Sequence, residues 1–237
     1  MELSVIQRAV DRRMRGLGLG ASARILDAPC GAGRLTAALR ARGCDARGAD
    51  IEPGAATLIG DSFERVDLAQ PWPWPDASFD AVLSVEGIEH LESPFAYLRE
   101  IHRVLKPGGT LVLTTPNIVS LRSRVRFLGS GFFHHDPRPL REAARHLLHH
   151  ISTMTLAELR YALRTSGFEL REAAHTHIKP ASYLYVWIAP LVWIYTRVAF
   201  RKERDPAQRE ANVAIRRALV SRSLLLGENL LLVARKA

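Results

Sequence analysis

The most constraining feature of the sequence is the segment ILDAPCGAGRLT, which begins at Ile25. Its apolar start is the pattern of a short buried strand, predicted over 23–28, and a helical pattern follows over 34–42. Between them, Gly31 and Gly33 predict a tight turn. A strand that passes through such a turn into a helix brings backbone N–H groups close to a ligand, and a Cβ at the turn would block the approach. The segment therefore predicts a ligand-binding loop at the carboxyl end of a strand.

An acidic residue at the end of the next predicted strand points to a nucleotide-type ligand. That strand covers 45–51 and contains Asp50, nineteen residues after Gly31. An acid at this position can accept hydrogen bonds from ribose hydroxyls. A dinucleotide fingerprint would place a third glycine at position 36, where this chain has Thr36. The departure argues against NAD and favours S-adenosylmethionine (SAM), which has no pyrophosphate, while a strand–helix turn that binds nothing is the remaining alternative.

Apolar strand patterns alternate with amphipathic helix patterns along the rest of the chain. The further strands are predicted over 64–68, 79–85, 110–115, 168–173 and 229–234, and the further helices over 3–16, 93–105 and 155–166. Pro107, Gly108 and Gly109 are predicted to end the second of these helices. Such alternation is typical of a doubly wound parallel sheet. Because about a dozen residues separate Asp50 from the next strand, the helix between them must be very short or lost.

We therefore expect an α/β fold of the Rossmann-like doubly wound class, with a mainly parallel seven-stranded sheet and a hydrophobic C-terminal helical insertion. The predicted domains are a core over 1–178, an inserted segment over 179–222 and the last strand of the core sheet within 223–237. The chain has 237 residues, 47% of them hydrophobic and 24% charged, which is the composition of a globular chain. Two cysteines without a C-x-x-C pair argue against disulfides and thiolate metal sites. The charged N-terminal residues lack the apolar core of a signal peptide, so we expect a cytoplasmic location.

Four segments in order resemble the motifs of class I SAM-dependent methyltransferases over about residues 20–118. They are ILDAPCGAGRLT, GADIEP, VDLAQPWPWPDASFDAVLSVEGIEHL and VLKPGGTLVLTTPN. The resemblance implies that the chain binds SAM with residues at the ends of successive strands. By that resemblance, the methionine part is surrounded by Asp27, Gly31 and Gly33, and Pro29 and Cys30 of the same loop also bind the cofactor. The ribose is held by Asp50, the adenine meets Ile51, Asp67 and Leu68, and the floor near the sulfonium is formed by Ser84 and Val85.

The segment Glu86-Gly87-Ile88-Glu89-His90 directly follows the strand predicted over 79–85. An open α/β sheet places its ligand crevice at such strand ends. Methyl transfer mainly requires an aligned acceptor and a group that removes its proton, so we interpret His90 and Glu89 as the catalytic candidates.

The same E-x-x-E-H pattern resembles the metal-binding segment of ubiquinone-pathway O-methyltransferases and of small-RNA 2′-O-methyltransferases. Both groups add a later His five residues before a Thr that precedes a helix, and His150 stands five residues before Thr155. The resemblance implies a site for Mg²⁺ or a similar divalent cation at Glu86, Glu89, His90 and His150. A base or orienting role for His90 without a metal, and a purely structural Glu-His pair, are the alternatives.

The strongly basic composition and an uncharged segment leave the partner open. The formal charge of +9 favours anionic partners such as nucleic acid, phospholipid headgroups or phosphorylated substrates. Residues 180–196 contain no charged residue but several aromatic ones, and Arg197, Arg201, Lys202 and Arg204 follow at once. Three interpretations compete for this segment: a buried cap, a dimer interface, or a membrane-surface anchor over 180–204. The oligomeric state stays undetermined.

The second half of the chain bears on the acceptor. The segments TPNIVSLRSRVRFLGSGFF, HHIST and LRYALRTSGFEL resemble bacterial methyltransferases of polysaccharide and lipid-linked glycan pathways. Arg122, Arg124 and Arg126 either line an entrance for an anionic substrate or form a solvated helix face. We therefore expect a SAM-dependent methyltransferase that O-methylates a glycan, lipid-linked or small-molecule hydroxyl, peripheral on the cytoplasmic membrane face if the acceptor is lipid-linked. The alternatives are an RNA 2′-O-methyltransferase, disfavoured because no RNA-binding module is visible, and an inactive SAM-fold binding protein.

Overall fold

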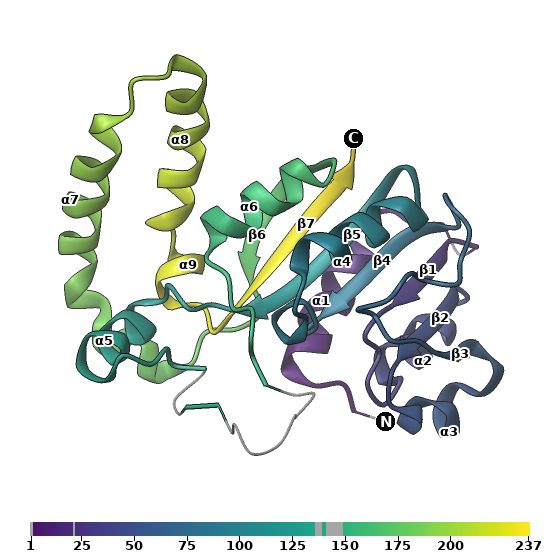
Figure 1. Ribbon diagram of the computed structural model, residues 1–237. Coiled ribbons are helices and arrows are strands. Elements are labelled where there is room, and N and C mark those ends of the chain that lie inside the picture. The colour runs from purple at the N-terminus through teal and green to yellow at the C-terminus, as the bar shows by residue number, and fades with distance from the viewer. Residues whose placement is uncertain (1, 21, 136–138, 141–148) are drawn as a thin grey trace.

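A computed structural model describes residues 2–20, 22–135, 139–140 and 149–237. Its centre is a seven-stranded sheet in the order β3-β2-β1-β4-β5-β7-β6 (Figure 1). The strands are β1 (Arg24–Asp27), β2 (Asp45–Asp50), β3 (Phe63–Arg65), β4 (Phe79–Val85), β5 (Leu105–Pro116), β6 (Phe168–His175) and β7 (Asn229–Lys236). Only β7 runs antiparallel to its neighbours, β5 and β6. The expected Rossmann-like, mainly parallel fold is confirmed.

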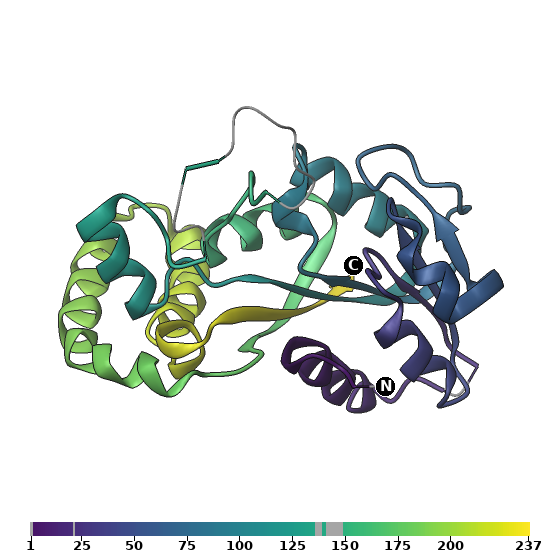
Figure 2. The same ribbon diagram turned by 90° about the horizontal axis from the view of Figure 1, so that it is seen from below.

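Helices cover both faces of the sheet, so the central strands are buried on both sides. The helices are α1 (Val5–Arg15), α2 (Arg34–Arg40), α3 (Ala56–Ile59), α4 (Pro94–Val104), α5 (Leu121–Ser130), α6 (Leu156–Thr165), α7 (Ala189–Ala199), α8 (Pro206–Leu219) and α9 (Arg222–Leu226). One hydrophobic core packs α1 and α2 against the sheet, and the other packs α4 and α6 against it. Figure 2 shows α1 and α4 on opposite faces.

Local sequence signals explain where several helices begin. Ser4 and Gln7 form a capping box at the start of α1, and Thr155 and Glu158 form another at the start of α6. Each box satisfies backbone N–H groups that the first helical turn leaves without partners. The region after Asp50 contains the four-residue helix α3 between two 3-10 turns, so the expectation of a very short helix is confirmed.

Two predicted boundaries are wrong. The strand predicted over 64–68 ends at Arg65, because Val66 leaves the ladder after one hydrogen bond to the carbonyl of Asp50. The Pro-Gly-Gly motif does not end α4, which stops at Val104; the motif lies inside β5. The pairing of β4 with β5 shifts register there, and such a bulge tolerates a proline without an N–H and a glycine at positive φ.

The segment between β6 and β7 forms a helical hairpin that projects from one end of the sheet (Figure 1). It consists of the 3-10 helix η4 (Pro180–Ile188), α7, the 3-10 turn η5 (Phe200–Lys202) and the returning helix α8. We refer to residues 180–219 as the hairpin. Among the described residues, the stretch Pro180–Lys202 is long and apolar enough to cross a membrane, judged by length and composition alone.

Candidate functional site

A cavity of about 670 Å³ opens where β1, β2 and β4 end, which is the size of an ordinary cofactor site. Most of the residues predicted to contact SAM line it: Asp27, Pro29, Cys30, Gly31, Asp50, Ile51, Asp67, Leu68 and Val85. Glu86 and His90 from the proposed acceptor side also line it, as does Gln7 of α1. The structure therefore brings the predicted cofactor loop and the predicted catalytic segment to one cavity.

The loop after β1 is shaped to receive a ligand. The Gly31 N–H donates to Asp50 Oδ2 at 2.8 Å, and the Glu52 N–H donates to Asp50 Oδ1 at 3.1 Å. Each carboxylate oxygen can accept more than one hydrogen bond, so Asp50 keeps capacity for ribose hydroxyls. A Cβ on Gly31 would meet no heavy atom within 4 Å, so the cavity is open beside this glycine. The residues present thus fit the nucleoside and methionine parts of SAM.

Gly33 and Ser84 do not line the cavity, although both were predicted contacts. A Cβ on Gly33 would lie 3.2 Å from the Ala55 side chain, so this glycine allows α2 to approach α3. Ser84 is fully buried, and its Oγ lies 2.9 Å from the hydroxyl of Tyr97, which donates to the Ala28 carbonyl at 2.6 Å. In the structure these residues position the loops around the cavity.

Asp27 is a buried acid at the base of the cavity. Burial raises its pKa to about 7, and the hydrogen bond from Thr36 Oγ1, at 2.7 Å, opposes that rise. Thr36 is the residue that replaces the third glycine of a dinucleotide fingerprint. Its hydroxyl therefore has a specific role in this chain, because it fixes the orientation of the Asp27 carboxylate.

Glu86 is held at the cavity wall in an unusual backbone conformation, with φ of 51°. Its Oε2 accepts a hydrogen bond from Asn229 Nδ2 at 2.6 Å, and its backbone N–H donates to Thr114. Burial raises the pKa of Glu86 to about 7, against the lowering effects of Thr114, His150 and Asn229.

Glu89, His90 and His150 form the cluster predicted at the end of β4. One ligand atom from each lies within 4.8 Å of the others. Glu89 is fully buried and accepts a hydrogen bond from Thr115 Oγ1 at 3.0 Å, while His90 Nδ1 lies 3.1 Å from the carbonyl oxygen of His149. The rings of His90 and His150 meet edge to face, with their centroids 4.9 Å apart.

The cluster fits a divalent cation only in part. Glu86, the fourth predicted ligand, is not a member, because its carboxylate turns to Asn229. Two imidazoles and one carboxylate suit a borderline transition-metal ion, whereas Mg²⁺ prefers oxygen ligands. The donor set that the fold assembles is therefore poorer in oxygen than the predicted one.

Sequence reasoning missed two residues that shape the site. Tyr97 lies on the buried face of α4, where a tyrosine hydroxyl needs a polar partner, and this requirement is a signal that was not used. Asn229 is 143 residues from Glu86 in the chain, so no local pattern could connect them.

Comparisons with known proteins agree with this geometry. A family described as a methyltransferase domain matches residues 3–173. A ubiquinone biosynthesis O-methyltransferase of Xanthomonas campestris pv. campestris (strain B100) is 30% identical over 170 residues, which cover 67% of each chain. A second ubiquinone biosynthesis O-methyltransferase, from Ruegeria pomeroyi, is 33% identical over 105 residues, covering 41% of this chain and 42% of the relative.

Solved structures show the same fold at low sequence identity. A SAM-dependent methyltransferase from Archaeoglobus fulgidus superposes with a TM-score of 0.60 at 17% identity, covering 98% of this chain and 95% of the other. The 1,6-didemethyltoxoflavin-N1-methyltransferase of Burkholderia thailandensis, solved with S-adenosylhomocysteine, superposes with a TM-score of 0.57 at 18% identity, covering 99% of this chain and 79% of the other. The family match ends before the hairpin.

Proposed function

The chain belongs to the class I SAM-dependent methyltransferases, and on that premise we propose that it methylates a hydroxyl oxygen of a glycan, lipid-linked or small-molecule acceptor. The observation that carries this proposal is the position of His90. Its side chain lines the cofactor cavity beside the buried carboxyl of Glu89, at the edge where the acceptor must meet the methyl group. The two ubiquinone-pathway relatives, which are O-methyltransferases by name, support the choice of oxygen.

His90 is suited to act as the general base. A carbonyl oxygen only accepts hydrogen bonds, so the contact of His90 Nδ1 with the His149 carbonyl places the ring hydrogen on Nδ1 and the lone pair on Nε2. In the proposed step, the acceptor O–H proton moves to Nε2 while the oxygen attacks the methyl carbon. The carbon–sulfur bond breaks and its electron pair stays on sulfur, which yields S-adenosylhomocysteine. The nearby Glu89 carboxyl stabilises the imidazolium that forms.

A divalent cation held by Glu89, His90 and His150 is the second candidate for the same site. The observation in its favour is the convergence of their ligand atoms within 4.8 Å. When bound, such an ion supplies Lewis acidity that lowers the pKa of the acceptor hydroxyl. The surrounding residues would then orient the acceptor, since His90 would be a ligand and not a base.

The proposal is tested with labelled SAM and a cell extract separated into lipid, glycan, RNA and small-molecule pools. We expect label in one of the non-RNA pools, and we expect His90→Gln to lower turnover by about 100-fold or more with an unchanged SAM affinity in calorimetry. His102→Gln, at the far end of α4, is the matched control and should retain activity.

Label found only in RNA would contradict the proposed class of acceptor. If the chain binds neither SAM nor S-adenosylhomocysteine, the proposal that it is a methyltransferase enzyme is wrong. Full activity after exhaustive EDTA treatment, with no metal in the protein, would remove the cation and leave His90 as the base.

A further inference from the structure

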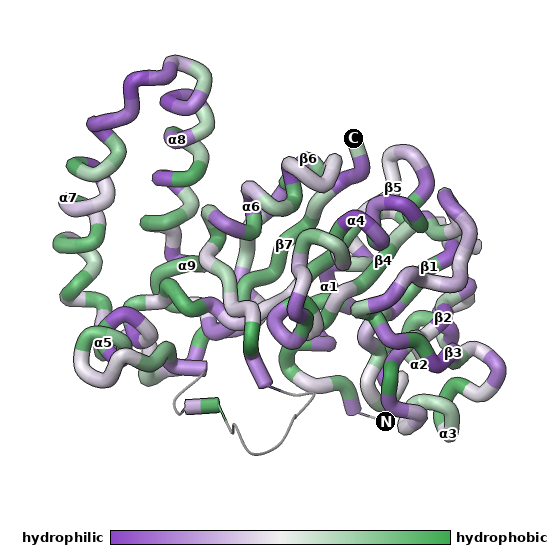
Figure 3. Tube along the Cα trace, in the orientation of Figure 1, coloured by the Kyte–Doolittle hydropathy of each residue, from purple (hydrophilic) through white to green (hydrophobic). Residues whose placement is uncertain are grey.

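The hairpin exposes an apolar face that no described part of the chain covers. We propose that this face docks on the surface of an anionic lipid bilayer, with η4 and α7 at the level of the headgroups. Figure 3 shows the hydrophobic residues along α7, on the part of the molecule that projects beyond the sheet. The docking surface lies outside the region that matches the methyltransferase family.

The exposed apolar side chains follow helical spacing along η4 and α7. Leu184 and Trp187 are each 73% exposed, Leu191 is 61% exposed and Tyr195 is 77% exposed. A contiguous apolar surface of this kind on a soluble-type fold marks an interaction site. Tryptophan and tyrosine are the side chains that favour the membrane–water interface, because one end of each is apolar and the other polar.

The opposite face of α7 is packed on the protein, and this determines how the helix can meet a membrane. Val192 and Thr196 are buried, and Val192 belongs to a small core with Leu121 of α5 and Leu226 of α9. A helix that crossed the bilayer would have to abandon these contacts. A helix that lies on the surface keeps them and places only its outer face among the lipids.

Charge selects anionic lipid over a second copy of the chain. The hairpin contains seven Lys or Arg and only three Asp or Glu. Arg197 lies over the ring of Trp193, at 5.4 Å from its centroid, so a cation accompanies an interfacial aromatic. Two such basic hairpins would repel each other across a symmetric interface, whereas anionic headgroups complement them.

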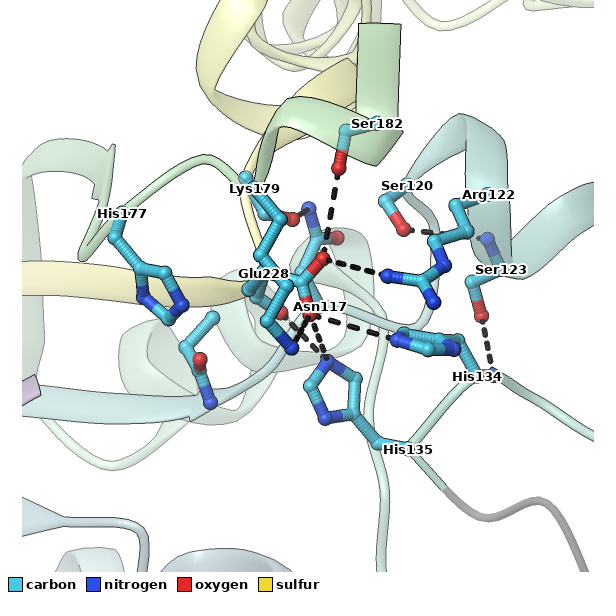
Figure 4. A network of polar contacts seen from close by, with 12 residues as sticks. Asn117, Ser120, Arg122, Ser123, His134, His135, His177, Lys179, Ser182 and Glu228 are labelled. Carbon is cyan, nitrogen blue, oxygen red and sulfur yellow. Dashed lines mark hydrogen bonds and ion pairs between the residues drawn. The ribbon is translucent and has the colours of Figure 1, made fainter. Parts of the chain in front are cut away.

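The root of the hairpin is fastened to Glu228, the residue that precedes β7, as Figure 4 shows. Lys179 Nζ lies 2.9 Å from the buried carboxylate of Glu228, and Ser182 Oγ donates to it at 3.5 Å. The next residue, Asn229, holds Glu86 at the cavity wall. A docked hairpin would therefore hold the cavity at a fixed place relative to the bilayer, which suits a lipid-linked acceptor; this last consequence rests on the proposed function.

Flotation of the whole chain with lipid vesicles tests the docking. We expect binding to phosphatidylcholine vesicles that contain phosphatidylglycerol, weakened by high salt, and little binding to phosphatidylcholine alone. Tyr195→Ser with Trp187→Ser should weaken binding by about tenfold, because both rings leave the interface. Tyr161→Ser, 65% exposed on α6, is the control for an exposed aromatic away from the hairpin and should bind like the wild type.

Two double variants test the electrostatic contribution to vesicle binding. Arg201→Glu with Lys202→Glu should abolish the preference for anionic vesicles, while Arg99→Glu with Arg164→Glu, the same charge change on exposed residues of α4 and α6, should leave most of it. SAM binding and circular dichroism verify that each variant folds.

Absence of flotation with anionic vesicles, or equal losses in the hairpin and control variants, would overturn the proposal. A dimer that Trp187→Ser dissociates, in a chain that ignores lipid, would assign the face to a second copy. Flotation does not require the acceptor. The docking proposal can therefore fail while the proposed methyl transfer to a hydroxyl holds, and the methyl-transfer proposal can fail while the docking holds.

Discussion

Asp27 is a buried carboxyl group on the wall of the cavity. It is 1% exposed, lines the cavity and has a pKa raised to about 7 by burial, despite the hydrogen bond from Thr36. The sequence motif predicts that Asp27 lies beside the methionine part of SAM, which carries an ammonium group. An ammonium ion next to this carboxylate offsets the cost of its burial, so the ionised form belongs to the bound state.

We therefore predict that SAM affinity depends on pH through Asp27. Below about pH 7, Asp27 must release its proton to pair with the ammonium, so calorimetry should show the Kd for SAM rising by up to about tenfold per pH unit of acidification. Asp27→Asn should remove this dependence and weaken binding at pH 8. Glu86→Gln, at a second cavity carboxyl with a pKa of about 7, should retain the dependence and serves as the control. A wild-type affinity that is flat between pH 5.5 and 7 would contradict the assignment.

The raised pKa of Asp27 also makes the folding stability of the cofactor-free chain depend on pH. The folded chain binds a proton there more tightly than the unfolded chain does, so the buried acid favours folding most below its ordinary pKa of 3.8. That contribution is lost as the pH rises through about 7. In the absence of SAM, the stability of the wild type relative to Asp27→Asn should decline across the same range.

At the scale of elements, the cavity is built by the close approach of two loops, one after β1 and one after β4. Gly87 follows β4, and a Cβ at this position would overlap the ring of Pro29 in the loop after β1. Cys30 of the same loop donates its N–H to the Ala49 carbonyl of β2 at 2.9 Å. The cofactor loop is thus held from both sides and has little freedom to retreat.

Gly87→Ala should therefore damage the cofactor site without changing any of its polar groups. The added methyl must displace Pro29, and such overpacking costs about 1–3 kcal/mol of stability. We expect a lower melting temperature and a weaker SAM affinity together. Gly54→Ala introduces the same methyl where no heavy atom lies within 4 Å, and it should change neither. Normal SAM affinity in Gly87→Ala would show that the loop can relax.

The same elements explain what could be predicted from the sequence. The limits of β4 were predicted correctly because Phe79–Val85 is a mostly apolar segment, interrupted only by Asp80 and Ser84, whose central residues are buried on both faces of the sheet. Most of the residues predicted to contact the cofactor line the cavity, because parallel strands bring their carboxyl ends to one edge. The Pro-Gly-Gly motif was misplaced because a helix stop and a strand bulge use the same residues. The contact of Glu86 with Asn229 was not predicted, because Asn229 lies at the start of the last strand and no local pattern connects the two residues.

At the scale of the whole molecule, one buried acid joins the hairpin to the sheet. The side chain of Glu228 is 2% exposed and lies just before β7, between Lys179 at the root of the hairpin and Arg122 of α5, at 2.9 and 3.5 Å. His134 Nε2 lies 3.5 Å from the same carboxylate (Figure 4). Burial would raise the pKa of Glu228, but Lys179, His134 and His135 together lower it below its ordinary value. The carboxylate therefore stays ionised and neutralises two cations, Lys179 and Arg122, from separate segments.

Replacing Glu228 should loosen the hairpin as a unit. Glu228→Gln keeps the shape but removes the charge, and because Lys179 is half exposed the loss is that of a charged hydrogen bond, about 1.5–3 kcal/mol. Glu169→Gln, in an exposed pair with Arg171, is the control and should cost about 0.5 kcal/mol or less by chemical denaturation.

The effect of Glu228→Gln should also depend on pH. Because the pKa of Glu228 is lowered by folding, its contribution to stability is present above the ordinary value of 4.5 and is lost as the pH falls through the lowered one. The stabilities of the wild type and Glu228→Gln should therefore converge in acid. Hydrogen exchange should accelerate in η4 and α7 of Glu228→Gln, with β1 and β4 protected as before; unchanged exchange in the hairpin would mean that the apolar contacts of Val192 alone hold it to the core.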